Sequence, residues 1–171
     1  MMTKSKLMDM LTGYAASHQH PFNIAVHMIG IPTIMLGVLI PLSWLSIAVS
    51  DFSFTLAHVV VAGFFLFYVT LDVPFALVFL VFGSALTVLA GWIAALPTAI
   101  SGTVAAIAFF GGYAAQFVGH AIEKSMPVLV KHPIQANLAA PFFTVVEVFK
   151  ILGLRDELFN EVQRQIALLR K

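Results

Sequence analysis

Long apolar stretches along this chain are separated by a few short polar breaks, which divide it into helix-sized pieces. The clearest breaks lie at 50–53, 72–74 and 96–98, where an aspartate or a proline ends one helix and precedes the next. A membrane-spanning helix needs about 20 mostly apolar residues. The pattern therefore predicts four spans, and the short connections predict that neighbouring helices run antiparallel. The expected spans are 22–48, 54–71, 74–96 and 98–121.

The segments outside these spans predict helices that do not cross the membrane. Residues 3–17 have apolar positions at near-helical spacing and predict an interfacial helix. Residues 134–153 are apolar but interrupted by an amide, a proline and two charges, which favours a re-entrant or interfacial segment. Residues 155–170 alternate apolar and charged positions, as is typical of an amphipathic helix on a membrane surface.

Together these elements predict an all-α fold, a polytopic membrane helical bundle that forms one domain over residues 1–171. It has about four transmembrane helices, with interfacial or re-entrant helices at its C-terminal end.

The composition supports a membrane protein and excludes several other classes. Hydrophobic residues make up 60% of the 171 residues and charged residues 10%, with a mean hydropathy of +0.98, whereas soluble domains are about a quarter charged. Cysteine is absent, which excludes disulfides, thiolate ligands and a cysteine nucleophile. No basic patch of the kind that binds nucleic acid is visible. The first twenty residues lack the pattern of a removable signal peptide.

The positions of the cationic residues predict the orientation in the membrane. All nine Lys and Arg lie at positions 4 and 6 or from 124 onward. Four spans place both termini on one side, and the positive-inside rule makes that side cytoplasmic. His27 and His120 then lie within roughly 10 Å of the same membrane boundary. An odd number of spans would separate them by about 30 Å.

Two groups of polar residues stand at the ends of the hydrophobic region that contains no Lys or Arg. Asn23 and His27 are four residues apart and share one helix face. Pro21 suits the first turn of that helix, so His18 and His20 precede it and can fold back toward His27.

At the other end, Gln116, His120 and Glu123 are spaced i, i+4, i+7 and form one polar stripe on an apolar helix. A single histidine near a helix end is more often hydrogen-bonded than a metal ligand. Several ionisable groups at one predicted depth favour a functional site. Three imidazoles with a nearby carboxylate suit Fe(II) or Zn(II), and ligand type alone does not choose between them.

Three other ionisable residues are assigned to the surface or to packing. His58 is isolated on the second span, and His132 lies in a loop beside a proline. Asp72 is interpreted as a loop acid or a helix cap.

Three motifs in combination resemble those of the Mpo-like family of small membrane proteins. The motifs are Ser17-His18-Gln19-x-Pro21-x-Asn23-x-x-x-His27-x-x-Gly30-x-Pro32, Gln116-Phe117-x-Gly119-His120-x-x-Glu123-x-x-x-Pro127 and Pro141-x-Phe143-x-x-x-Glu147. The family's fungal founder is an endoplasmic-reticulum enzyme that shortens a 2-hydroxy fatty acid derived from phytosphingosine by one carbon.

The resemblance implies an Fe(II)-dependent dioxygenase of lipid metabolism that performs α-oxidation with O2 as co-substrate. The substrate would be a 2-hydroxy fatty acid or a related lipid, whose acyl chain lies among apolar helices and membrane lipids. The implied metal ligands are His18, His27 and His120. The implied polar companions are Asn23, Gln116, Glu123 and Glu147.

The resemblance also implies roles and a location. Glu123 or Glu147 would accept a hydrogen bond from a ligand imidazole or take the 2-hydroxyl proton. The membrane would be the endoplasmic reticulum in a eukaryote and the inner membrane in a bacterium.

Two other functions use the same residues. A zinc-dependent lipid hydrolase would need the same ligands but no oxygen. A non-catalytic proton or metal carrier would use His and Glu as a relay, although the polar residues gather at one boundary rather than across the bilayer. A homo-oligomer is a further possibility, because the small residues of 111–115 suit helix pairing.

Overall fold

The computed structural model describes residues 2–169, apart from the side chains of residues 2–5, 131 and 169. Residues 1, 170 and 171 of the predicted domain, including the last residue of the predicted helix over 155–170, lie outside the described residues. The elements in chain order are α1 (Met2–Ala15), α2 (Pro21–Ser43), β1 (Ser46–Val49), β2 (Phe52–Thr55), α3 (Leu56–Val69), α4 (Val73–Ala94), α5 (Thr98–Glu123), α6 (Val128–Lys131), α7 (Pro133–Ile151) and α8 (Asp156–Leu169). The fold is all-α apart from one small hairpin, as predicted.

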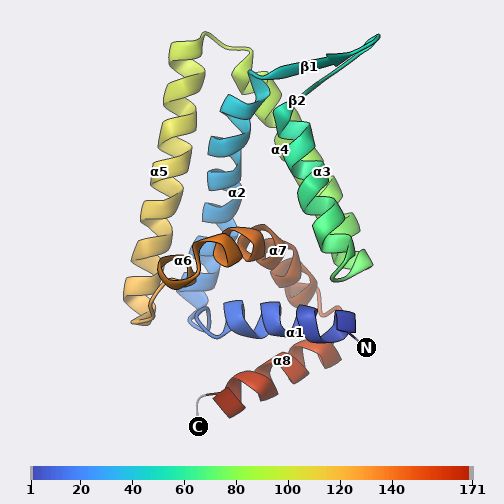
Figure 1. Ribbon diagram of the computed structural model, residues 1–171. Coiled ribbons are helices and arrows are strands. Elements are labelled where there is room, and N and C mark those ends of the chain that lie inside the picture. Colours follow the sequence, from blue (N-terminus) through green and yellow to red (C-terminus); the bar gives the residue numbers. More distant parts are fainter. Residues whose placement is uncertain (1, 170–171) are drawn as a thin grey trace.

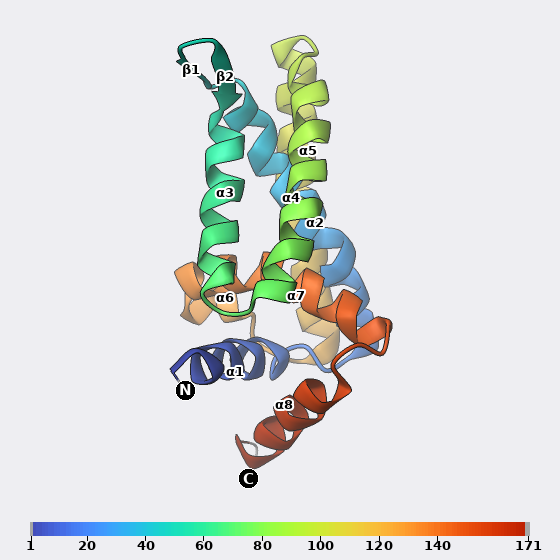
Figure 2. The ribbon, with the colours of Figure 1, turned by 90° about the vertical axis from the view of Figure 1, so that its right-hand side faces the viewer.

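The long helices stand upright and the others lie across one end of them (Figure 1). Helices α2, α3, α4 and α5 run side by side with alternating directions (Figures 1 and 2). Helix α7 crosses them at the level of their lower ends, and α1 and α8 lie below it. The first and last helices therefore lie at the same end of the bundle.

Four helices in the described part of the chain are long and apolar enough to cross a membrane: α2, α4, α5 and α7. The number agrees with the prediction, but the set differs. The predicted span 54–71 is the 14-residue helix α3, which at ~1.5 Å per residue is about 21 Å long. The interrupted segment 134–153 corresponds to α7, a continuous helix of 19 residues that begins at Pro133 and has Pro141 in its interior.

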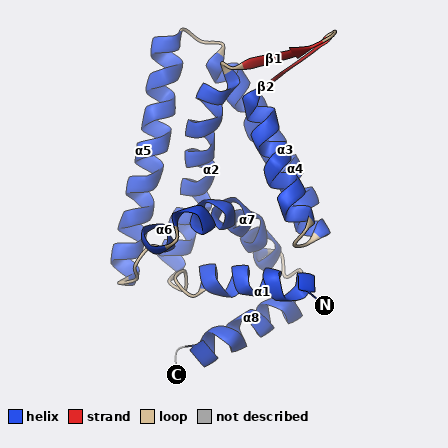
Figure 3. Cartoon of the chain, viewed as in Figure 1, coloured by secondary structure: helices blue, strands red, loops and turns tan. Residues whose placement is uncertain are grey.

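A β-hairpin replaces the predicted end of the first span. Helix α2 ends at Ser43 rather than at residue 48, and β1 pairs antiparallel with β2, with Val49 opposite Phe52 (Figure 3). Ser50 adopts a left-handed conformation with φ of 53° and turns the chain in two residues. A short apolar run fits a strand as well as a helix, so hydropathy did not separate the two.

Glycines allow α2 and α5 to approach closely. A Cβ added to Gly37 of α2 would lie 2.6 Å from the backbone nitrogen of Phe109, and one added to Gly112 of α5 would lie 2.6 Å from Cγ1 of Ile34. Small residues permit this approach of helix backbones in membrane proteins. Gly112 thus packs α5 against α2 within one chain, whereas a Cβ added to Gly111 beside it would meet nothing within 4 Å.

Helix α8 packs its apolar face on α1. Val162 and Ile166 are buried in one cluster with Leu7 and Leu11 of α1. The apolar face that predicted a membrane-surface helix is therefore covered by protein.

An ion pair fixes the chain just before α8. The Arg155 guanidinium donates to Asp72 at 2.7 Å and lies over the Phe75 ring. Asp72 also caps α4 by accepting from the Phe75 backbone N–H at 3.2 Å, which confirms its interpretation as a helix cap.

Candidate metal centre

Three histidines from distant parts of the sequence converge at the end of the bundle where α1 lies. His18 comes from the turn before α2, His27 from the second turn of α2 and His120 from the last turn of α5. One ring nitrogen of each lies within 4.8 Å of the others. Their exposed fractions are 2%, 1% and 4%. The cluster can hold a metal ion, and its three residues are those that the sequence indicated.

Hydrogen bonds fix the tautomers of two of the imidazoles. Nδ1 of His18 lies 2.7 Å from the Tyr14 carbonyl oxygen, and Nδ1 of His27 lies 2.9 Å from the Asn23 carbonyl oxygen. A carbonyl oxygen only accepts, so each Nδ1 carries the proton. The Nε2 lone pairs of both rings are therefore free.

Ser125 fixes the tautomer of the third imidazole. Its hydroxyl donates to the Ser17 carbonyl at 3.3 Å. With its proton used there, the hydroxyl oxygen accepts from Nδ1 of His120 at 2.9 Å. All three rings thus offer Nε2, and each is oriented through Nδ1, the arrangement that metal-binding histidines adopt.

The His18 ring fits a metal ligand for a further reason. Its Nε2 is buried and has no hydrogen-bond partner among the described residues. Burial and the neighbouring His27 lower the pKa of His18 to about 3. The ring therefore stays neutral near pH 7, with an unused lone pair that a cation would satisfy.

Tyr14 holds the His18 ring in place. The two rings stack in parallel at 4.2 Å between centroids, and Phe143 packs against Tyr14 at 4.7 Å. Burial raises the pKa of the Tyr14 phenol, which remains protonated. Tyr14 and Ser125 were not among the predicted site residues. Their distances in sequence of four and five residues from His18 and His120 were the available signal.

Glu123 and Asn23 form a clamp between α5 and the turn that carries His18. The Glu123 carboxylate accepts from the Gln19 backbone N–H at 2.8 Å and from the Asn23 side-chain amide at 2.7 Å. The same amide donates to the Ser17 carbonyl at 3.3 Å. Among the described hydrogen bonds, no imidazole donates to Glu123. The acceptors for the three rings are instead two carbonyls and the Ser125 hydroxyl.

Gly119 leaves room for the Asn23 side chain beside α5. A Cβ at Gly119 would lie 2.4 Å from Oδ1 of the fully buried Asn23. Only a residue without a side chain fits here, which accounts for the glycine directly before His120.

A cavity of about 380 Å³ extends from the histidines into the bundle. Its polar end is lined by the three imidazoles, Tyr14 and Gln116, and its apolar part runs between α2, α3 and α5, with α6 and α7 closing one side. A mostly apolar cavity with a few convergent polar groups is typical of a small-molecule site.

Gln116 lies in this cavity without a partner. It precedes His120 by one helical turn, and its Nε2 is buried with no hydrogen bond to any described residue. Tyr113, which also lines the cavity, is satisfied by donating to Asn137 at 3.0 Å.

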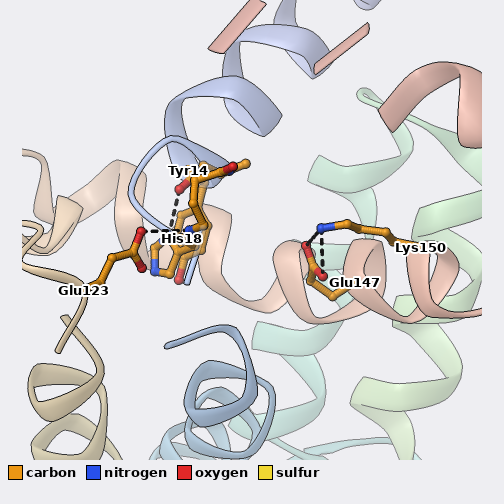
Figure 4. A network of polar contacts seen from close by, with 7 residues as sticks. Tyr14, His18, Glu123, Glu147 and Lys150 are labelled. Carbon is orange, nitrogen blue, oxygen red and sulfur yellow. Dashed lines mark hydrogen bonds and ion pairs between the residues drawn. The ribbon is translucent and has the colours of Figure 1, made fainter. Parts of the chain in front are cut away.

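The structure places Glu147 in a different cluster. Its carboxylate lies 3.4 Å from the Lys150 ammonium, in a small pocket formed with α1 and α8 (Figure 4). It does not line the cavity that contains the three histidines.

The remaining histidines lie at the surface. His20 is exposed and caps α2 by accepting from the Phe22 N–H at 3.2 Å. His58 is exposed and bonds to Thr55 at the start of α3, and His132 is exposed at the start of α7. The assignment of His58 and His132 to surface or packing is confirmed.

Comparison with known protein families gives one match. Residues 4–152 match the model of a family described as 2-hydroxy-palmitic acid dioxygenase Mpo1-like. Neither the curated proteins nor the solved structures gave a match.

Proposed function

Because this chain belongs to the Mpo1-like family, we propose that it is a membrane-embedded, Fe(II)-dependent dioxygenase that shortens 2-hydroxy fatty acids by one carbon. By atom balance, a 2-hydroxy acid and one O2 give the acid one carbon shorter, CO2 and water. The observation that carries the proposal is the cluster of three buried imidazoles, in which one ring nitrogen of each lies within 4.8 Å of the others, beside a mostly apolar cavity.

The metal ligands in this proposal are His18, His27 and His120, each through Nε2. Iron bound there supplies a redox-active centre with coordination positions left for oxygen and substrate. Three neutral imidazoles leave the dication's charge uncompensated, so the site attracts an anionic head group such as a carboxylate. The charged head of the substrate is thereby held at the polar end of the cavity.

The apolar part of the cavity would hold the acyl chain. It is lined by Ile31, Met35 and Leu39 of α2 and by Val61 and Phe64 of α3. These side chains exclude water from the chain, and each buried methylene contributes about 0.8 kcal/mol to binding.

Glu123 and Asn23 are positioning residues in this proposal. Their hydrogen bonds hold the turn containing His18 against the end of α5 that carries His120. Glu147 belongs to the packing of α7 against α1 and α8 and takes no part in the chemistry.

The centre would lie at the cytoplasmic boundary of the membrane. The first and last helices lie at the same end of the bundle as the histidines (Figure 2), and the Lys and Arg residues of the sequence concentrate toward the two termini. The membrane would be the inner membrane of a bacterium or the endoplasmic reticulum of a eukaryote.

Metal analysis and an oxygen-dependent assay test the proposal together. The purified chain should contain about one iron per molecule and convert a 2-hydroxy fatty acid to the acid one carbon shorter only when O2 is present. His27→Ala and His120→Ala should lose both properties, because two imidazoles hold the metal less tightly than three. His132→Ala, which removes an exposed imidazole, should keep both.

Two results would contradict the proposal. One is full activity in the His27→Ala or His120→Ala variant. The other is activity that requires zinc and not oxygen, which would identify a hydrolase built on the same ligands.

A further inference from the structure

Gln116 presents an unsatisfied carboxamide to the cavity beside the three imidazoles. Its Nε2 is buried without a partner, and the side chain forms no hydrogen bond with the described residues. A buried amide normally finds a partner in the folded protein. A buried amide that lines a cavity and has no partner in the protein indicates that a ligand supplies the hydrogen bond.

A glycine on the neighbouring helix leaves room for the Gln116 side chain. On α2, Gly30 faces it, and a Cβ added there would lie 3.3 Å from Cγ and 3.4 Å from Nε2 of Gln116. Several nearby polar groups are bonded elsewhere: Nδ1 of His27 and of His120 are hydrogen-bonded, and Tyr113 bonds to Asn137. In the proposed function the free Nε2 atoms of the three imidazoles bind the metal. The protein therefore positions the carboxamide but leaves it unpaired.

We propose that Gln116 recognises the head group of a 2-hydroxy acid: its Nε2 donates a hydrogen bond to the carboxylate, and its Oε1 accepts a hydrogen bond from the 2-hydroxyl. The inference rests on the proposed function, because it takes the substrate class from it. A carboxamide has a donor and an acceptor side by side, and a 2-hydroxy acid presents the complementary pair on adjacent carbons. A plain fatty acid lacks the hydroxyl, and a 2-oxo acid lacks its proton. Gln116 thus distinguishes 2-hydroxy acids from both.

Anaerobic binding measurements test this role without turnover. The dissociation constants of a 2-hydroxy fatty acid and of the plain acid of equal length are measured for the purified protein in detergent, with its metal content determined. Gln116→Met removes both hydrogen-bonding groups while keeping a similar length. It should weaken binding of the 2-hydroxy acid about ten- to a hundredfold and reduce the preference over the plain acid, with unchanged metal content.

A matched variant and a second substitution sharpen the test. Gln135→Met makes the same change on an exposed part of α7, outside this cavity, and should leave both dissociation constants unchanged. Gln116→Glu keeps an acceptor but places a negative charge against the carboxylate, and it should weaken binding of both acids.

The outcomes separate this inference from the proposed function. An unchanged preference for the 2-hydroxy acid in Gln116→Met would overturn the inference, as would a loss of metal from that variant, since Gln116 would then support the centre itself. A wild-type protein that shows no oxygen-dependent shortening, yet loses its 2-hydroxy preference in Gln116→Met, would overturn the reaction and keep the recognition role.

Discussion

Replacing Gly119 by alanine should disable the metal centre, although the atoms nearest to the new methyl group, apart from the flanking residues, belong to Asn23 and not to a histidine. The added Cβ would lie 2.4 Å from Oδ1 of Asn23, about 1 Å shorter than a carbon–oxygen contact of ~3.3–3.6 Å. Asn23 is fully buried, so its side chain cannot turn without losing its present contacts. Either the amide rotates or α2 and α5 separate.

Both responses break the clamp that closes the site. A rotated amide loses its 2.7 Å hydrogen bond to the Glu123 carboxylate, which is worth about 1.5–3 kcal/mol. Overpacking adds about 1–3 kcal/mol, and the better helix propensity of alanine offsets about 0.5–1 kcal/mol. The expected net loss of folding free energy is about 2–5 kcal/mol. Movement of α2 also displaces the Asn23 carbonyl that orients His27.

Thermal unfolding and metal analysis on the same preparations measure the two effects. The Tm of Gly119→Ala should fall by about 5–15 °C, and the bound metal should fall with it. Gly111→Ala is the matched control, because the substitution is identical, the helix is the same and a Cβ at Gly111 meets nothing within 4 Å. Its Tm should equal or exceed that of the wild type.

The reasoning would be refuted by a Gly119→Ala protein with wild-type Tm and full metal content. It would be refuted equally if Gly111→Ala lost as much stability, because the loss would then come from helix backbone effects rather than from contact with Asn23.

Two further substitutions separate residues that act on the centre from residues that lie apart from it. Ser125→Ala removes the acceptor that orients His120 and should weaken metal binding about ten- to a hundredfold. A competition titration with a chelator measures the metal affinity. The control Ser53→Ala, on the exposed hairpin, should leave this affinity unchanged. Glu147→Gln should keep its metal and its activity, because its partner is Lys150 rather than an imidazole. Although Glu147 is buried, the Lys150 side chain is exposed and stays solvated in the variant, so the free energy of unfolding should fall by about 1 kcal/mol or less. A loss of metal in this variant would place Glu147 in the centre after all.

Helix periodicity and the uneven distribution of charge relate residues that are far apart in the sequence. For this reason the sequence predicted the cluster of histidines. The four-residue spacing of Asn23 and His27 predicted a shared face, and the carbonyl of one indeed accepts from the ring of the other. The even number of spans predicted that His27 and His120 meet at one end of the bundle, where their ring nitrogens lie within 4.8 Å.

The parts that were missed depend on local geometry that hydropathy does not encode. Residues 46–55 are apolar enough to extend a helix, but they pair as two strands around Ser50. Pro141 suggested a break in the segment 134–153, but it lies within the continuous helix α7. The partners of the imidazole Nδ1 atoms include backbone carbonyls, which carry no signature in the sequence.

The wide separation of the three histidines in sequence has a consequence for biogenesis. A nascent chain synthesised as far as α4 contains His18 and His27 but neither His120 nor the Ser125 hydroxyl that orients it. Since the chain is made from its N-terminus, no intermediate shorter than α5 has a complete set of ligands. A metal ion held by all three histidines would therefore be acquired late, by a protein most of whose helices are already inserted, and only after α2 and α5 have come together.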